Sequence, residues 1–150
     1  MPIIMEVVLV TGGCSSKKTI SARGAPILFK RALFPVSHKR KKTKTIAIAG
    51  THGKTTTTAM IATLLVALGQ DPSYVIGSVS ENLGGNAHAS NGDYFVIEAD
   101  EYDHMFHGLF PWIAVVTNVE YDHPDCFPTP VDFLMAFETF TDQVQDHGAL

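Results

Sequence analysis

A short apolar segment, a glycine loop and a helical pattern follow one another between residues 45 and 69, and this order constrains the fold strongly. Thr45-Ile-Ala-Ile-Ala49 is typical of a buried strand. The loop Gly50-Thr-His-Gly53 separates it from a helix predicted over residues 54–69, which ends at a glycine. The apolar residues of this segment recur at helical spacing: Met60, Ile61, Leu64, Leu65 and Leu68.

The loop has the composition of a phosphate-binding site. Its glycines allow backbone N–H groups to converge on anionic oxygens, Lys54 can reach the outer phosphates, and the Thr55 hydroxyl can bind Mg²⁺. The positive end of the helix adds to this attraction. Ile48 stands where the longer form of this motif has its first glycine, and a structural turn rich in Gly and Thr is the alternative. The residues predicted to bind the nucleotide are Gly50, Thr51, His52, Gly53, Lys54, Thr55 and Thr56.

Further strands and a helix follow along the chain. Strands are predicted at 74–76, 94–98 and 113–117, with a long loop rich in glycine and asparagine over residues 78–93. A helix is predicted over 131–144, with Phe133, Leu134, Phe137 and Phe140 on its apolar side. Apolar strands that alternate with helices predict an α/β fold of the phosphate-loop type: a mostly parallel sheet with helices on both faces. Ligands of such sheets bind at the carboxyl ends of the strands.

Two polar segments lie at predicted strand ends. Glu98-Ala-Asp-Glu-Tyr-Asp103 has four carboxylates that suit Mg²⁺ coordination, and strand periodicity does not distinguish Glu98 from Asp100. A solvated acidic loop is the alternative. Thr117-Asn-Val-Glu-Tyr-Asp-His-Pro-Asp125 places His123 between acids, which suits metal binding or proton transfer.

In Leu83-Gly-Gly-Asn-Ala87, Asn86 can offer its amide to a phosphate, or the segment is a plain turn.

Charge is divided unevenly along the chain. Residues 1–54 contain all eleven Lys and Arg and one acid, whereas residues 55–150 contain fourteen acids and no Lys or Arg, which gives −4 in total. The second stretch is therefore not expected to bind nucleic acid.

No segment approaches the ~20 apolar residues of a membrane span, so no membrane partner is expected. Cys14 and Cys126 are far apart and no secretion signal precedes them, which favours the cytoplasm.

The chain divides near residue 45. Residues 1–44 are expected to be an N-terminal remnant or linker, with a short strand at 6–10, a turn at 11–16 and a basic run at 39–44. The run is interpreted as a solvated linker rather than an anion-binding patch. Residues 45–150 are expected to form part of a nucleotide-binding domain, which we expect to be incomplete.

The motifs in this order resemble the central ATP-binding domain of the Mur ligase family. The segments that carry the resemblance are Ala47 to Thr58, Gly84-Gly-Asn86, Glu98-Ala-Asp-Glu101, Val116-Thr-Asn118 and Asp122-His123. The likeness covers roughly residues 25–145, and the histidine in G-T-H-G-K-T favours the alanine-adding branch.

The resemblance implies a reaction and a set of roles. ATP would phosphorylate the carboxylate of UDP-N-acetylmuramate, and the amine of L-alanine would attack the acyl phosphate. Lys54 would bind the β- and γ-phosphates, and Asn86 would lie near the transferred group. Thr55 and Glu98 would bind a first Mg²⁺, and His123 would help to bind a second. Thr51 and the loop amides would line the triphosphate.

The chain also departs from the family pattern. Several family members use a carbamylated lysine in the helix after the D-H motif, and this chain has no lysine beyond residue 54. Glu138 lies in that predicted helix and is a candidate replacement. The domains that would bind UDP and the amino acid are not recognisable, so we expect a fragment that is inactive alone. Alternatives are a murein-peptide-recycling ligase, a ligase like folylpolyglutamate synthase, or a non-catalytic nucleotide-binding domain. A kinase or GTPase is disfavoured because no N-K-x-D motif is present.

Overall fold

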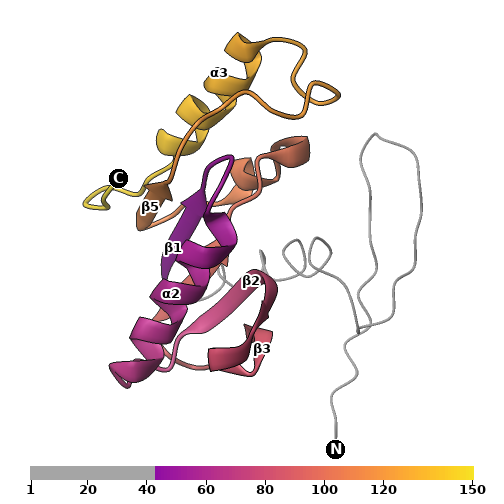
Figure 1. Ribbon diagram of the computed structural model, residues 1–150. Coiled ribbons are helices and arrows are strands. Elements are labelled where there is room, and N and C mark those ends of the chain that lie inside the picture. The colour runs from indigo at the N-terminus through magenta and orange to yellow at the C-terminus, as the bar shows by residue number, and fades with distance from the viewer. Residues whose placement is uncertain (1–42) are drawn as a thin grey trace, which may run out of the picture.

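The computed structural model describes residues 43–150, which form a five-stranded sheet with helices packed on it (Figure 1). The strands are β1 (Lys44–Ala49), β2 (Ser73–Ser80), β3 (Gly85–His88), β4 (Tyr94–Glu98) and β5 (Ile113–Val116). The helices are α2 (Lys54–Ala67), α3 (Pro130–Thr141) and two short 3₁₀ segments, η1 (Glu81–Leu83) and η2 (Tyr102–Gly108).

The sheet has the order β3-β2-β4-β1-β5. Strands β2, β4, β1 and β5 run parallel, and β3 pairs with β2 in the antiparallel direction. The central strand β1 has neighbours on both sides, so that Ile46 lies opposite Val96 of β4 and Ile113 of β5. This confirms the predicted mostly parallel sheet.

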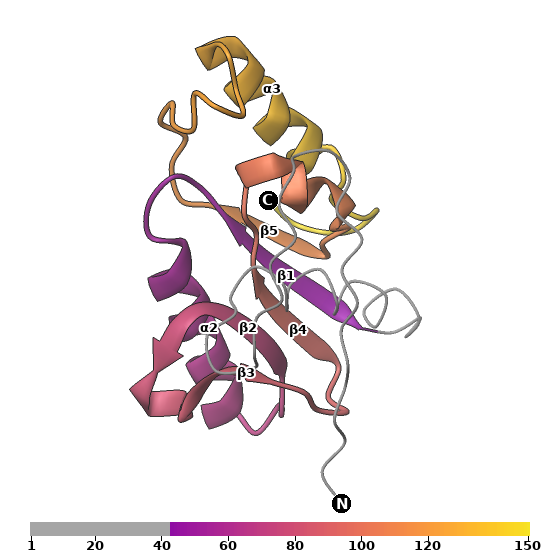
Figure 2. The same cartoon turned by 90° about the vertical axis from the view of Figure 1, so that its right-hand side faces the viewer.

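The two faces of the sheet bury different sets of side chains, because successive strand residues point to opposite sides. Ile46 and Ile48 join a cluster that includes Ala62 of α2. Ala47 and Ala49 join a larger cluster on the other face, which includes phenylalanines of η2 and α3. Figure 2 shows η2 between α3 and the strands. Helices therefore cover both faces, as predicted.

The predicted loop over 78–93 is wrong in part. Strand β2 continues to Ser80, and η1 and β3 follow within that stretch. Tyr74 pairs with His88 and Val75 with Ala87. The β3 residues are half-buried or exposed. An edge strand of this kind has no alternation of apolar and polar residues, so the sequence pattern did not indicate a strand here.

The predicted helices are confirmed, but their buried sides differ from the sequence pattern. Met60, Leu64 and Leu68 of the apolar repeat are 58–67% exposed, whereas α2 buries Thr58 and Ala62. In α3 the three phenylalanines are buried and Leu134 is half exposed.

Some predictions lie outside the described residues: the strand at 6–10, the turn at 11–16, Cys14, and the basic run before residue 43. Over residues 43–150, no helix has the length and apolar character that a membrane crossing requires.

Candidate functional site

The site lies where three neighbouring parallel strands end. Strands β4, β1 and β5 are adjacent, so the segments that follow them meet at one edge of the sheet. These segments are the loop 50–53, the acidic stretch 98–101 and residues 117–120. The sequence predicted all three as parts of a site.

The loop makes a sharp turn between β1 and α2. Gly50 has φ +129° and Gly53 has φ +82°, which are backbone conformations that favour glycine. Gly53 is the N-cap of α2 and provides no capping side chain. The first N–H groups of any helix have no acceptor within it, and here no capping side chain replaces one, so the N–H groups of Lys54, Thr55 and Thr56 are suited to an anion.

Residues after β5 hold the loop from the other side. The Thr51 N–H donates to the Asn118 carbonyl over 3.1 Å, and the His52 N–H donates to the Asn118 side-chain oxygen over 2.9 Å. The Thr51 hydroxyl donates to the Glu120 carbonyl over 2.8 Å. These two predicted phosphate-lining residues therefore use their amides to fix the loop. Sequence reasoning assigned no separate role to Asn118, although this residue lies in the T-N-x-E segment after the predicted strand.

The loop lysine pairs with a buried carboxylate. The Lys54 ammonium donates to both carboxylate oxygens of Glu101, over 2.8 and 2.9 Å, and to the Gly50 carbonyl over 2.5 Å. The side chain of Glu101 is 1% exposed and that of Lys54 is 14% exposed. Sequence reasoning grouped Glu101 with the other acids and missed this pairing, because the separation of 47 residues leaves no local signal.

The next residue of the helix faces the other buried carboxylate. The Thr55 hydroxyl donates to Glu98 over 3.1 Å, and the Gly77 N–H donates to the second Glu98 oxygen over 2.6 Å. Asp100 instead is partly exposed and accepts from the Tyr102 N–H. The structure therefore distinguishes Glu98 from Asp100, which periodicity did not.

His123 lies near Glu101, at the edge of the site. Its Nε2 is 3.8 Å from a Glu101 carboxylate oxygen, and its backbone has φ +56°. The Tyr102 ring meets the imidazole edge-on, with 5.1 Å between centroids, and the Tyr102 hydroxyl donates to Asp125 over 2.8 Å. That hydrogen bond, with a further one to Cys126, raises the pKa of the Tyr102 phenol. The Tyr102 ring, whose hydroxyl is held by Asp125, thus packs against the imidazole.

Two other predicted residues lie elsewhere. Asn86 belongs to β3, which is separated from β1 by β2 and β4. Glu138 is exposed on α3, away from the buried side of that helix. The structure does not bring either residue to the lysine.

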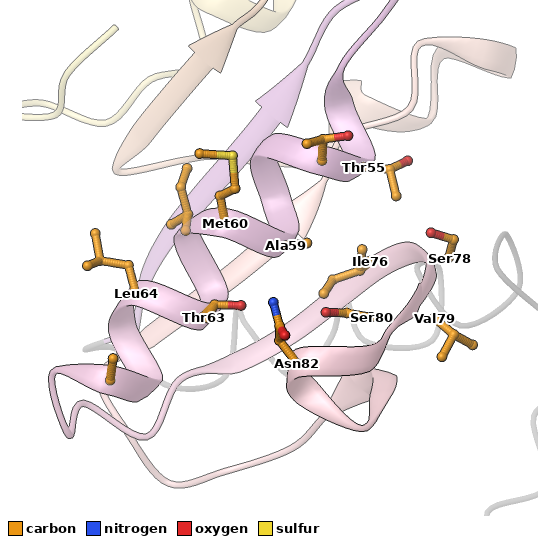
Figure 3. Close-up of a pocket in the computed structure, with 13 residues that line it drawn as sticks. Thr55, Ala59, Met60, Thr63, Leu64, Ile76, Ser78, Val79, Ser80 and Asn82 are labelled. Carbon is orange, nitrogen blue, oxygen red and sulfur yellow. The ribbon is translucent and has the colours of Figure 1, made fainter.

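A groove opens beside the site, between α2 and β2. It has a volume of about 830 Å³ and is lined largely by apolar side chains, with Thr55 at the end nearest the glycine loop (Figure 3). Met60 and Leu64 line it from α2, and Val79 and Asn82 line it from the opposite side.

The donor set fits one Mg²⁺ ion. Oxygen ligands about 2.1 Å from an octahedral Mg²⁺ lie about 3.0 Å apart when adjacent, and the Thr55 and Glu98 oxygens are 3.1 Å apart. Among residues 43–150, no three His, Cys, Asp or Glu side chains converge on one point.

The mostly parallel sheet, the glycine loop, the lysine and threonine at the start of α2 and the carboxylates after β4 are the features of an α/β domain of the phosphate-loop type. Residues 48–150 match the Mur ligase middle domain. The chain belongs to the Mur ligase family.

Relatives with similar sequences are described as UDP-N-acetylmuramate–L-alanine ligases. The protein from Frankia alni is 51% identical over 105 residues, which cover 70% of this chain and 18% of that protein. The protein from Chlorobium chlorochromatii is 38% identical over 148 residues, covering 95% of this chain and 31% of its own length. The chain therefore spans less than a third of these relatives.

Solved structures agree with the family. A UDP-N-acetylmuramate:L-alanyl-γ-D-glutamyl-meso-diaminopimelate ligase from Neisseria meningitides has a TM-score of 0.70 and 34% identity, covering 79% of this chain and 41% of that one. The UDP-N-acetylmuramate-alanine ligase from Thermotoga maritima has a TM-score of 0.66 and 32% identity, covering 77% and 26%.

Proposed function

We propose that this chain carries the ATP site of a cytoplasmic ligase that joins L-alanine to UDP-N-acetylmuramate through an acyl phosphate. The observation that carries the proposal is the placement of Lys54 and Thr55 at the start of α2, opposite Glu98 and Glu101 at the end of β4. The names of the similar sequences support the choice of substrates.

The chemistry needs charge neutralisation more than a covalent nucleophile. The substrate carboxylate attacks the γ-phosphorus of ATP, which gives the acyl phosphate and ADP. The alanine amine then attacks the acyl carbon, and phosphate leaves from the tetrahedral intermediate as the amide forms.

The residues at the loop divide this work. Lys54 would bind the β- and γ-phosphates, and the N–H groups of Lys54, Thr55 and Thr56 would face the same oxygens. Thr51 and His52 would hold the loop in the shape that fits the triphosphate. Bound Mg²⁺ would neutralise phosphate charge during transfer.

Other residues of the site would bind the metal ions and contact the substrate. Thr55 and Glu98 would bind the first Mg²⁺, as their 3.1 Å separation allows. His123 would help to bind a second ion next to the substrate carboxylate, and Asn86 would approach the transferred phosphate. Since residues 55–150 contain no lysine, a carbamylated lysine has no place in this stretch, and Glu138 is the candidate substitute.

We further propose that the 150-residue chain binds Mg·ATP without forming the amide on its own, because it spans 18–31% of the similar ligases named above. Detection of UDP-N-acetylmuramoyl-L-alanine after incubation with all substrates would contradict this.

The nucleotide site is tested by calorimetry with Mg·ATP. Lys54→Ala should weaken binding by about tenfold or more, since it removes charge-assisted hydrogen bonds to phosphate. Lys44→Ala is the matched control, because Lys44 lies at the other end of β1 over the Trp112 ring. Equal heats for the parent chain and Lys54→Ala would rule out the nucleotide site.

A murein-peptide ligase is a second candidate, favoured by the Neisseria structure with its TM-score of 0.70. The candidates differ in the amine acceptor: L-alanine, or L-alanyl-γ-D-glutamyl-meso-diaminopimelate. Because the domain that would bind the acceptor is not recognisable in this chain, the comparison uses the longer ligase of which we propose this chain to be a part. ATP-dependent amide formation is measured there with each acceptor, and faster reaction with the tripeptide would favour the second candidate.

A further inference from the structure

Glu101 is a buried charge whose role goes beyond the acidic motif that contains it. It follows β4 and is the N-cap of η2, and its carbonyl accepts from the His104 N–H over 3.0 Å. With its side chain 1% exposed, the carboxylate is removed from water and requires a partner. The backbone of the strand end and of η2 fixes where that charge lies.

The partner is Lys54, and its ammonium group directs its hydrogen bonds at Glu101 and at the backbone. An ammonium group has three N–H donors. In this structure the Lys54 donors are directed at both Glu101 oxygens and at the Gly50 carbonyl. An incoming phosphate must therefore share the ammonium with Glu101 or displace it.

The charges next to the loop sum to a negative value. Lys54 contributes one positive charge, whereas Glu98 and Glu101 contribute two negative ones within hydrogen-bond reach of residues 54 and 55. Among residues 43–150 the one other Lys or Arg is Lys44, which lies at the opposite end of β1. A metal-free nucleotide meets net repulsion here, and a divalent cation reverses the sign.

We propose that Glu101 is a positioning residue that holds the Lys54 ammonium where phosphate will bind, and that its charge makes nucleotide binding depend on a divalent cation. The second part rests on the proposed nucleotide site. Glu101 acts through Lys54 and touches neither nucleotide nor metal in this scheme.

The charge is tested with Glu101→Gln, which keeps an acceptor oxygen and removes the charge. The measurement is the ratio of ATP affinities with Mg²⁺ and with EDTA. We expect the ratio to fall about tenfold or more, mainly because metal-free ATP binds better. Glu81→Gln removes the same charge from an exposed position in η1 and should leave the ratio unchanged. An unchanged ratio in Glu101→Gln would overturn the charge role.

The positioning is tested without nucleotide, by acetylation of lysines followed by peptide mass spectrometry. Glu101→Ala should label Lys54 several-fold faster than the parent chain, with exposed Lys44 as the internal reference. Equal Lys54 rates would overturn the positioning role. Circular dichroism checks the fold, and if the alanine variant is unfolded, the same assay on Glu101→Gln decides.

The two assays separate this proposal from the nucleotide site. If the parent chain binds no ATP, the proposed function and the cation dependence both fail, while acetylation still decides whether Glu101 positions Lys54. If ATP binds normally and neither assay responds to Glu101, the nucleotide site stands and the role of Glu101 is rejected.

Discussion

Gly50 combines two constraints at the point where β1 becomes the loop. Its φ of +129° is disfavoured for other residues, and a Cβ atom there would lie 2.1 Å from the Thr117 hydroxyl oxygen. The same hydroxyl donates to the His52 carbonyl over 2.6 Å. Glycine is therefore needed at residue 50 for two reasons: the turn requires its backbone conformation, and Thr117, which follows β5, leaves no space for a side chain.

We expect Gly50→Ala to lower the free energy of unfolding by about 3 kcal/mol, from backbone strain together with the displaced Thr117. Urea denaturation measures the change. Gly84→Ala is the matched control: φ there is +68° but nothing lies within 4 Å of the added methyl group, so the loss should be about 1 kcal/mol. Equal losses would show that the contact with Thr117 is unimportant.

Gly77 supports Glu98 from the neighbouring strand β2. Its N–H donates to the carboxylate, and an added Cβ would lie 2.5 and 2.8 Å from the two oxygens. A side chain at this position must therefore push Glu98 away from its present place beside Thr55.

Gly77→Ala should weaken Mg·ATP binding about tenfold, because the carboxylate moves away from the Thr55 hydroxyl. The loss of unfolding free energy should stay within about 2 kcal/mol. Calorimetry and urea denaturation measure the two effects. Gly85→Ala, where nothing lies within 4 Å, should change neither. Unaltered affinity in Gly77→Ala would mean that the position of Glu98 does not matter.

At the residue scale, the sequence predicted the glycine turn and the helix start after it, and it did not separate the carboxylates. The turn and the helix start are determined within a few adjacent positions of the G-T-H-G-K-T segment, whose role in binding nucleotide stays a prediction. Glu98 and Glu101 acquire distinct partners only because β4 lies beside β1, and that adjacency arises from sheet pairing about fifty positions apart. The roles of His123 and Asn86 stay predictions.

Helix α3 begins with a complete capping box. The Asp132 N–H donates to the Thr129 hydroxyl over 3.2 Å, and the Thr129 N–H donates to the Asp132 carboxylate over 3.0 Å. Pro130 occupies the first helical position, where its missing N–H costs nothing. The start of α3 is thus determined by three neighbouring residues.

Thr129→Ala should cost about 1 kcal/mol of unfolding free energy, because it removes the capping hydroxyl. Thermal or urea denaturation measures this. Thr139→Ala, on the exposed side of the same helix, should have no cost or a slight gain, since alanine favours helix more than threonine does. A cost in Thr139→Ala as large as in Thr129→Ala would exclude capping as the cause.

At the element scale, helices and buried strands were predictable and the sheet edge was not. Strands β1 and β4 are apolar because both of their faces are covered, which is a strong signal. Strand β3 has only β2 as a neighbour and keeps its side chains partly in solvent, so Gly85-Asn-Ala-His88 has the composition of a loop. In α2 the helical spacing of apolar residues predicted the helix correctly but not its buried side, since Met60 and Leu64 are exposed.

Over the whole molecule, an aromatic layer joins η2 and α3 to the sheet. Phe106 is fully buried, stacks on Phe140 with 4.9 Å between centroids, and meets Phe137 edge-on at 5.2 Å. Because η2 begins at the residue after Glu101, this layer also anchors the acidic stretch of the site.

Phe106→Ala should lower the free energy of unfolding by about 3–5 kcal/mol, from lost burial and the cavity left among the rings. Phe110→Ala, at a position that is 49% exposed, should cost less than about 1.5 kcal/mol. Denaturant titration followed by circular dichroism compares the two. A small loss in Phe106→Ala would show that the layer does not stabilise the fold.

The central place of β1 has a consequence for how the chain is made. Its partners are distant in sequence: Lys44 pairs with Tyr94, and Ile46 pairs with Ile113. At about 5–20 residues per second, a ribosome needs roughly 3–10 s to make the fifty residues that separate β1 from its first partner strand. During that interval the backbone of β1 and the loop that follows it have no sheet to join. High contact order of this kind slows folding, so the loop after β1, although synthesised before β4 and β5, takes its folded shape only after those strands have been made.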